Sequence, residues 1–248
     1  MDRLIFTAAS GMSAAMTQQR VIASNLANAQ TIGFRAETLE STPMTLEGPQ
    51  LEVRSLNQTQ VHGALMTQGS IVSTGRGLDI AMQGDALLAV QASDGGEGYT
   101  RRGDLSVSPT GVLQTGDGLL VMGDDGPITM PPEAKVSISP EGGVLIADPA
   151  KPGEPPTQVA KLKLVSWRGS NIHKDLTGLF RVPNNGVLPT DESASVMPGS
   201  LEQSNVKPTE VLVAMVDAQR SFDIRTKMIA TARELDEGGA SLMRLTPA

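Results

Sequence analysis

A long segment near each end of this chain, residues 1–28 and 209–245, lacks proline, whereas the middle is rich in proline and glycine. Residues 1–28 contain one glycine, Gly11, and residues 209–245 contain only Gly238 and Gly239. Because proline and glycine are the poorest helix formers, their scarcity predicts a helix at each end. The middle predicts β structure, since turn residues recur through it. A helix at each end of a β middle indicates a protein that builds an assembly and not a self-contained enzyme.

Composition narrows the function further. Among 248 residues there are 20 Lys and Arg, no Cys, and a formal net charge of -7. Without a basic cluster the chain lacks the electrostatic footprint of nucleic-acid binding. Without cysteine it has neither disulfides nor thiolate metal ligands. The longest apolar runs, such as 86–90, are far shorter than the roughly 20 residues of a membrane span.

Heptad spacing suggests that the terminal helices pair with other helices. In each terminal segment, small or apolar residues recur at the period of about 3.5 residues found in helix–helix contacts. They are Ile5, Met12 and Leu26, then Ala8, Ala15 and Ile22, at one end, and Met215, Phe222 and Ile229 at the other. At the C-terminal end, Val211, Ala218, Arg225 and Ala232 share the other heptad position, where Arg225 interrupts the apolar pattern. The pair Gly238–Gly239 is expected to weaken or kink that helix. The alternative is an ordinary amphipathic helix packed on its own domain.

The middle of the chain predicts an antiparallel β domain, as a meander or barrel, because short apolar runs alternate with turn signals at spacings of about ten residues. The expected strands are 78–82, 86–91, 104–108, 112–115, 119–123, 135–140, 143–147 and 159–167. Residues 36–70 read as an extended arm. The predicted fold class is therefore α+β, with a coiled-coil-like helical domain (1–35 and 204–248), the arm, and a β-rich domain (71–203).

Chemistry-bearing motifs are missing. His62 and His173 are the only histidines, and neither has a partner at metal-ligand spacing. Neither a phosphate-binding glycine loop nor a nucleophile elbow occurs. The acidic stretches at 94–97 and 124–126 lack the alternating ligands of a calcium loop and predict hairpin turns. These patterns single out no catalytic, metal-binding or cofactor-binding residue, and only a carboxylate pair that meets in the fold stays open.

Four segments resemble one known family. Residues 23–35, ASNLANAQTIGFR, resemble the N-terminal motif of the flagellar rod and hook proteins, and 204–222 resemble their C-terminal motif. Residues 84–91 and 99–123 resemble central segments of the same family. The residues that carry the match or the helical pattern are Asn25, Leu26, Ala27, Asn28, Thr31, Gly33, Phe34 and Arg35, then Asn205, Val206, Glu210, Met215, Gln219, Arg220, Phe222 and Ile229.

The resemblance implies a structural subunit of the bacterial flagellar basal-body rod, of the proximal-rod branch, with the distal-rod branch as the alternative. Such subunits have no catalytic site and no cofactor, and they leave the cytoplasm through the flagellar type III export apparatus without a cleaved signal peptide. Their terminal helices form a tube around the export channel, inside a rod that spans the periplasm and transmits torque. The implied partners are further copies and other rod proteins, not nucleic acid.

Local roles follow for three motif residues. We expect Asn25 and Asn28 to form hydrogen bonds near the end of the first helix, and Gly33 to supply a bend that a Cβ would forbid. The rival of a different class is a secreted β-rich enzyme or carbohydrate-binding module. It would need an aromatic platform or a polar cleft, and the six aromatic residues (four Phe, one Tyr, one Trp) are scattered.

Overall fold

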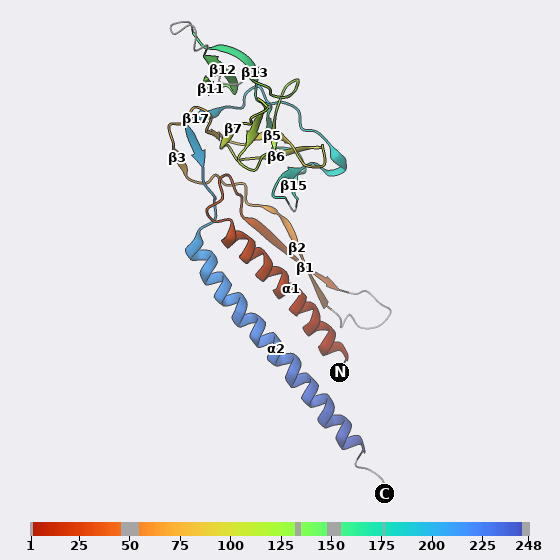
Figure 1. The fold of residues 1–248 in the computed structure, drawn as a ribbon. Coiled ribbons are helices and arrows are strands. Elements are labelled where there is room, and N and C mark those ends of the chain that lie inside the picture. Colours follow the sequence, from red (N-terminus) through yellow and green to blue (C-terminus); the bar gives the residue numbers. More distant parts are fainter. Residues whose placement is uncertain (1, 46–54, 132–134, 148–154, 176, 245–248) are drawn as a thin grey trace. The chain divides into compact units, whose positions relative to one another are not determined.

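A helix lies near each end of the chain, and strands fill most of the residues between them (Figure 1). The computed structural model describes residues 2–45, 55–131, 135–147, 155–175 and 177–244. The chain divides into two compact units. The helical unit contains residues 1–27, 37–62 and 207–248, and the β unit contains residues 28–36 and 63–206. The predicted α+β class is confirmed.

The two helices end close to their expected limits. Helix α1 runs from Asp2–Ala27 and helix α2 from Pro208–Arg244. Pro208 occupies the first helical position, where its missing N–H would have no intrahelical partner. Helix α2 continues through Gly238–Gly239 to Arg244, so the glycine pair does not end it. Glycine in a helix interior costs only about 1 kcal/mol relative to alanine, so a pair need not end a long helix.

The helical unit is built on the pairing of α1 with α2, which run antiparallel (Figure 1). Ala15 of α1 and Ala218 of α2 are buried, as expected where small side chains allow close approach. Residues 36–70 contain two strands, β1 (Glu37–Thr45) and β2 (Ser55–Ala64), which form a two-stranded sheet. Strand β1 lies against α1.

The β unit contains one large sheet and three small ones, and all of the pairings recorded in it are antiparallel. The large sheet has the order β15-β16-β6-β5-β9-β8-β7, with β10 beside β9 and β14 beside β5. Its strands are β5 (Ala86–Gln91), β6 (Glu97–Thr100), β7 (Leu105–Val107), β8 (Leu113–Thr115), β9 (Leu120–Gly123), β10 (Gly126–Pro127), β14 (Leu164–Ser166), β15 (His173–Lys174) and β16 (Phe180–Arg181).

The smaller sheets join segments that are distant in sequence. One contains β11 (Lys135–Ile138), β12 (Gly143–Ala147) and β13 (Thr157–Lys161). The other two pair β4 (Ile80–Met82) with β17 (Val196–Pro198), and β3 (Ile71–Ser73) with β18 (Ser200–Glu202). A short 3-10 helix, η1, covers Pro183–Asn185.

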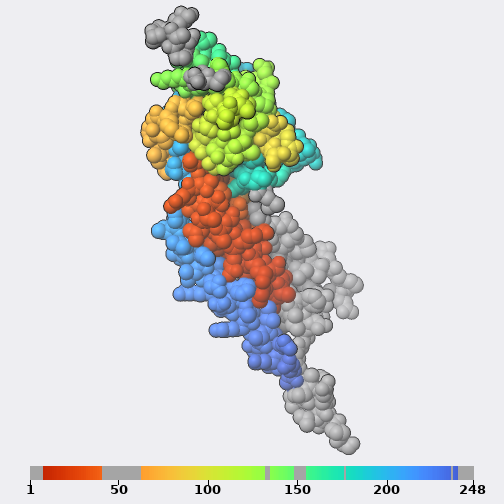
Figure 2. Space-filling view, viewed as in Figure 1, coloured from red at the N-terminus to blue at the C-terminus, as the bar shows by residue number. Residues whose placement is uncertain are grey.

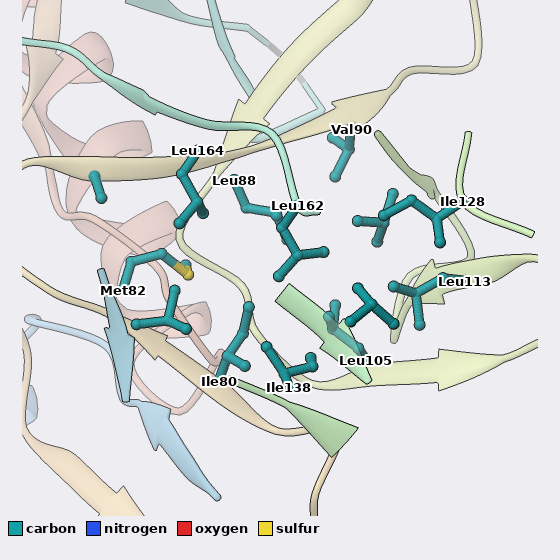
Figure 3. Packing of buried hydrophobic residues seen from close by; sticks show 14 of the residues in the cluster. Ile80, Met82, Leu88, Val90, Leu105, Leu113, Ile128, Ile138, Leu162 and Leu164 are labelled. Carbon is teal, nitrogen blue, oxygen red and sulfur yellow. The ribbon is translucent and has the colours of Figure 1, made fainter. Parts of the chain in front are cut away.

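Strand β5 is the centre of the hydrophobic core, because both of its faces are buried. Leu88 and Val90 belong to the larger apolar cluster, which aliphatic side chains from several sheets fill (Figure 3). Leu87 and Ala89 point into a second cluster with Tyr99. The segment Ala86–Leu88 is thus buried on both faces, by mainly aliphatic side chains on one face and by aliphatic and aromatic side chains on the other.

Candidate assembly site

The contact between α1 and α2 includes an arginine that the heptad pattern marked as an interruption. The guanidinium of Arg225 donates a hydrogen bond to the backbone carbonyl of Gly11 in the middle of α1. A Cβ on Gly11 would lie 2.8 Å from Arg225 Nη1, so the glycine leaves room for this side chain. Nearby, Gln19 Nε2 lies 3.4 Å from Gln219 Oε1. Arg225 therefore takes part in the pairing of the helices.

The face of α2 opposite its contact with α1 carries large apolar side chains in contact with water. Val213 is 63% exposed and Ile224 is 59% exposed. At 100° per residue the exposed apolar residues of this face span roughly 160° of the helix, on the side away from buried Ala218. We call this surface the outer face of α2; its residues are Leu212, Val213, Val216, Ile224, Met228 and Leu235. Figure 2 shows the side chains of α2, in blue, beside those of α1, in red.

The residues singled out from the C-terminal pattern lie in different surroundings on α2. Phe222 and Ile229 are half-buried, as is Leu26 of α1. Three others are exposed to solvent: Met215, Gln219 and Arg220. Glu210 is also exposed and forms an ion pair with Lys207 at 2.9 Å. Ala27, the last residue of α1, is exposed.

Asn25 ties the end of α1 to the start of β1. Its side-chain oxygen accepts a hydrogen bond from the backbone N–H of Glu37 at 2.8 Å, and its Nδ2 donates to the Glu37 carbonyl at 3.1 Å. The amide thus imitates the backbone of a neighbouring strand and satisfies one donor and one acceptor. Asn25 is buried, so this pairing also satisfies its own polar atoms. The expected hydrogen-bonding role of Asn25 is confirmed.

Asn28 starts the turn that follows α1. Thr31 donates its backbone N–H to the Asn28 carbonyl and its hydroxyl to Asn28 Oδ1, both at 3.1 Å. Phe34 continues the turn by donating its N–H to the carbonyl of Thr31. Asparagine and threonine favour such turns because their short polar side chains can bond nearby backbone or side-chain groups. The expected local role of Asn28 is also confirmed.

Gly33 is required both by its backbone conformation and by its neighbours. Its φ is +69°, in the left-handed region that residues with a Cβ rarely adopt. A Cβ placed there would lie 2.4 Å from the backbone carbon and oxygen of Arg101. The close approach lets the Gly33 N–H donate to the backbone carbonyl of Glu202 at 2.8 Å. The predicted bend is thus present, and it brings two distant segments together.

Three charged side chains meet inside the β unit. Arg35 Nη2 lies 2.7 Å from one carboxylate oxygen of Glu202, and Arg101 Nη2 lies 2.6 Å from the other. Arg101 Nε also donates to Glu202, at 2.9 Å. Each of the three side chains is only 1% exposed to solvent. We call this group the Arg35–Glu202–Arg101 cluster.

The two arginines of the cluster differ in how well their donors are satisfied. Besides Glu202, Arg101 donates to the backbone carbonyls of Met82, Gly84 and Ala86 at 2.7–2.9 Å. Arg35 donates to the carbonyl of Thr67, while its Nε has no partner among the described residues. Burial lowers the pKa of Arg35 to about 10, although the negative charge of Glu202 opposes this shift.

Asn205 holds the segments beside the cluster. Its Oδ1 accepts from the backbone N–H of Ala36 at 2.8 Å, and its Nδ2 donates to the carbonyls of Leu65 and Thr67 at 2.7 and 2.9 Å. The next residue, Val206, is buried. The remaining motif residue, Phe34, lies under Lys174, whose Nζ is 3.5 Å from the centre of the ring.

Sequence reasoning did not find two members of the cluster. Arg101 occupies the fixed Arg of the Y-T-R-x-G segment that resembles the family, and Arg102 its variable position, but the motif gives no sign that Arg101 is buried or which residue it pairs with. Glu202 precedes the C-terminal motif by two residues and carries no local signal. Since glutamate is rarely buried unless paired, a sequence reader expects it on the surface. Its partners are identified only by the three-dimensional fold.

The described residues offer no sign of metal or membrane chemistry. Among them, no group of three His, Cys, Asp or Glu side chains is arranged to hold a metal ion. In the same part of the chain, neither helix combines the length and the apolar character that crossing a bilayer requires. The arrangement of the motif residues is therefore one of packing, turns and buried ion pairs.

Comparison with known proteins gives three family-model matches along the chain. Residues 5–35 match a flagella basal body rod protein model, 81–146 match the D1 domain model of the flagellar hook protein FlgE/F/G, and 197–242 match the C-terminal model of the flagellar basal body rod FlgEFG proteins. The Arg35–Glu202–Arg101 cluster takes one residue from each matched segment.

Curated relatives match over almost the whole chain. The flagellar basal-body rod protein FlgF of Salmonella typhimurium is 40% identical over 97% of this chain and 98% of its own length. FlgF of Escherichia coli is 40% identical over 93% of this chain and 94% of its own length. FlgG of Bacillus subtilis is 30% identical over 98% of this chain and 100% of its own length.

Proposed function

Because the chain belongs to the flagellar basal-body rod protein family, as an FlgF-like structural subunit and not an enzyme, we propose that it builds the proximal rod by packing its terminal helices against those of neighbouring subunits. The higher identity to the two FlgF proteins than to the FlgG of Bacillus subtilis supports the proximal position. An FlgG-like subunit of the distal rod is the alternative within the family.

The observation that carries this proposal is the outer face of α2. A helix on the surface of a monomer normally turns mainly charged and polar side chains toward water, whereas this face also exposes six large apolar ones beside charged residues such as Arg220 and Lys227. Single exposed apolar residues are ordinary, whereas several on one face of a helix favour an interaction site. A neighbouring helix with the same coiled-coil-like spacing would remove this surface from water, so the face favours assembly.

The motif residues lie in or beside the two helices that would make this contact. We assign the assembly role to residues 1–35 and 204–248, the role of a linking arm to 36–70, and the outer position to the β-rich segment 71–203. The surfaces in contact would differ between the two subunits, and such heterologous contacts repeat helically when the rotation does not close a ring. Repetition would build a tube around the export channel.

The same proposal covers localisation and partners. We place the subunit in the part of the basal body that crosses the periplasm, where it would contact other copies, other proximal rod proteins and FlgG, and help transmit torque. We propose delivery by the flagellar type III export apparatus without a cleaved signal peptide. Isolated helices are marginal in water, which suits terminal helices that become fully ordered only when they meet their partners, while residues 28–36 belong to the β unit.

The test places a charge on the outer face of α2. Val213→Asp changes a 63% exposed side chain, and aspartate and valine have similar helix propensities, so the monomer should fold normally. In the assembled rod the carboxylate would be buried without a partner, at a cost of several kcal/mol per subunit. We expect a strain that carries only this variant to lose swimming and to yield no complete basal bodies in electron micrographs.

Val187→Asp is the matched control. Val187 is 59% exposed and lies in the β unit, so the variant adds the same charge at a similar exposure away from the helices. This control should swim normally. Swimming by the Val213→Asp strain, or equal loss in both strains, would show that the outer face of α2 is not a packed interface.

A further inference from the structure

The Arg35–Glu202–Arg101 cluster joins segments that are far apart in the sequence. Arg35 lies in the segment that follows α1, Arg101 follows β6, and Glu202 is the last residue of β18. We propose that Glu202 is a latch, which makes docking of residues 28–36 in the β unit conditional on prior docking of residues 200–206. A chain without its C-terminal part would then leave its N-terminal motif undocked.

Charge balance gives the latch its direction. Two guanidinium groups share one carboxylate, and a buried charge without a partner is strongly unfavourable. Arg101 has three backbone carbonyls as acceptors besides Glu202. Arg35 has one such carbonyl and a Nε without a partner among the described residues. Arg101 is therefore able to receive Glu202 first, whereas Arg35 needs Glu202 already in place.

Hydrogen bonds from the same short segment extend the dependence to the backbone. The carbonyl of Glu202 accepts from Gly33, and its carboxylate accepts from the N–H of Gly69 at 2.9 Å. Asn205, three residues later, bonds Ala36 and the carbonyl of Leu65. Undocking of residues 200–206 thus removes acceptors or donors from both 28–36 and 63–69. These segments should gain and lose order together.

The latch predicts an asymmetry between two variants of the cluster. Glu202→Gln leaves two buried guanidiniums without a carboxylate, so residues 28–36 and 63–69 should both become mobile. Arg35→Met leaves Arg101 and Glu202 as a balanced pair, so only residues 28–36 should loosen while 200–206 stay docked. A purely structural cluster without direction would loosen all three segments in either variant.

Hydrogen exchange of the full-length monomer, followed by mass spectrometry, measures these segments separately. In Glu202→Gln we expect exchange in 28–36 and 63–69 to be on the order of 100-fold faster, because removing one partner of a buried ion pair is strongly destabilising. Exchange in β5 (Ala86–Gln91) should stay as in the unchanged protein. In Arg35→Met, 28–36 should exchange faster and 200–206 should not.

Asp117→Asn serves as the control, since it also removes one carboxylate from an arginine pair in the β unit. Asp117 contacts Arg102 at 2.6 Å but is 57% exposed, so exchange should not change. Unchanged exchange of 28–36 in Glu202→Gln would overturn the latch. If Glu202→Gln also unfolds β5, Arg35→Met decides: equal loosening of 28–36 and 200–206 in that variant refutes the proposed direction.

Discussion

Replacing Gly33 by alanine should destabilise the β unit through two separate effects. The left-handed conformation at φ +69° costs a residue with a Cβ about 1–2 kcal/mol. The added Cβ would also lie 2.4 Å from Arg101 backbone atoms, against the roughly 3.5–4.0 Å of an ordinary contact between carbon atoms. The two backbones must therefore move apart by about 1 Å, as these distances imply.

That movement has its own cost. It stretches the 2.8 Å hydrogen bond from Gly33 to the Glu202 carbonyl past its useful range, which loses about 1 kcal/mol. Displacement of a packed neighbour adds about 1–3 kcal/mol. Together with the conformational term, we expect Gly33→Ala to lower the free energy of unfolding by about 3–6 kcal/mol.

Gly118 provides a control that separates the two effects. Its φ is +81°, but a Cβ there would meet no atom within 4 Å. Gly118→Ala should therefore lose only the conformational term of about 1–2 kcal/mol. Urea unfolding of each purified chain, followed by the fluorescence of its single tryptophan, Trp167, gives both values. Equal losses in the two variants would refute the argument from close approach.

Two further predictions concern pH. Burial raises the pKa of Tyr99, the only tyrosine, to about 12, so its ultraviolet absorbance in the folded protein should titrate near that value. The contribution of this group to the free energy of unfolding is complete below about pH 10 and declines as the pH rises toward 12. A tyrosine that titrates near pH 10 with the fold intact would contradict the prediction. Burial alone would raise the pKa of Asp79, but hydrogen bonds from Arg76 and Thr74 lower it below its ordinary value. The contribution of Asp79 to the free energy of unfolding is therefore present above about pH 4 and is lost as the pH falls further. Asp79→Asn should flatten the acid side of a plot of stability against pH, and an unchanged plot would contradict this.

Patterns over a few neighbouring residues predicted those helices and strands that begin and end at local signals such as turn residues. Both helices and the strands β5 and β12 were recovered from periodicity and from the turn residues beside them. Residues 159–167 read as one strand because their apolar residues continue without a turn signal. The structure divides them between β13, which pairs with β12, and β14, which pairs with β5. No local feature marks this change of partner.

Long-range pairings and buried charges were beyond the reach of the sequence. The pairing of β3 with β18 joins residues more than a hundred positions apart, and it is this pairing that places Glu202. The role of Gly33 could be predicted because glycine has a distinct conformational freedom. Glu202 has no such signature: the same residue type is usually solvated, and only the fold supplies its two arginines.

The chain places several side chains against the usual preference of their types. Large apolar groups face water on the outer face of α2, while two arginines and a glutamate are buried in the β unit. Neither arrangement is the most stable one for a monomer, since exposed apolar surface gains nothing from folding and buried ion pairs are often no better than apolar replacements. In an assembled rod, the first would be removed from water by a neighbouring subunit. The buried Arg35–Glu202–Arg101 cluster is satisfied only when all three of its segments are docked. The conformation that a neighbouring subunit meets would therefore be the one in which all three segments are in place.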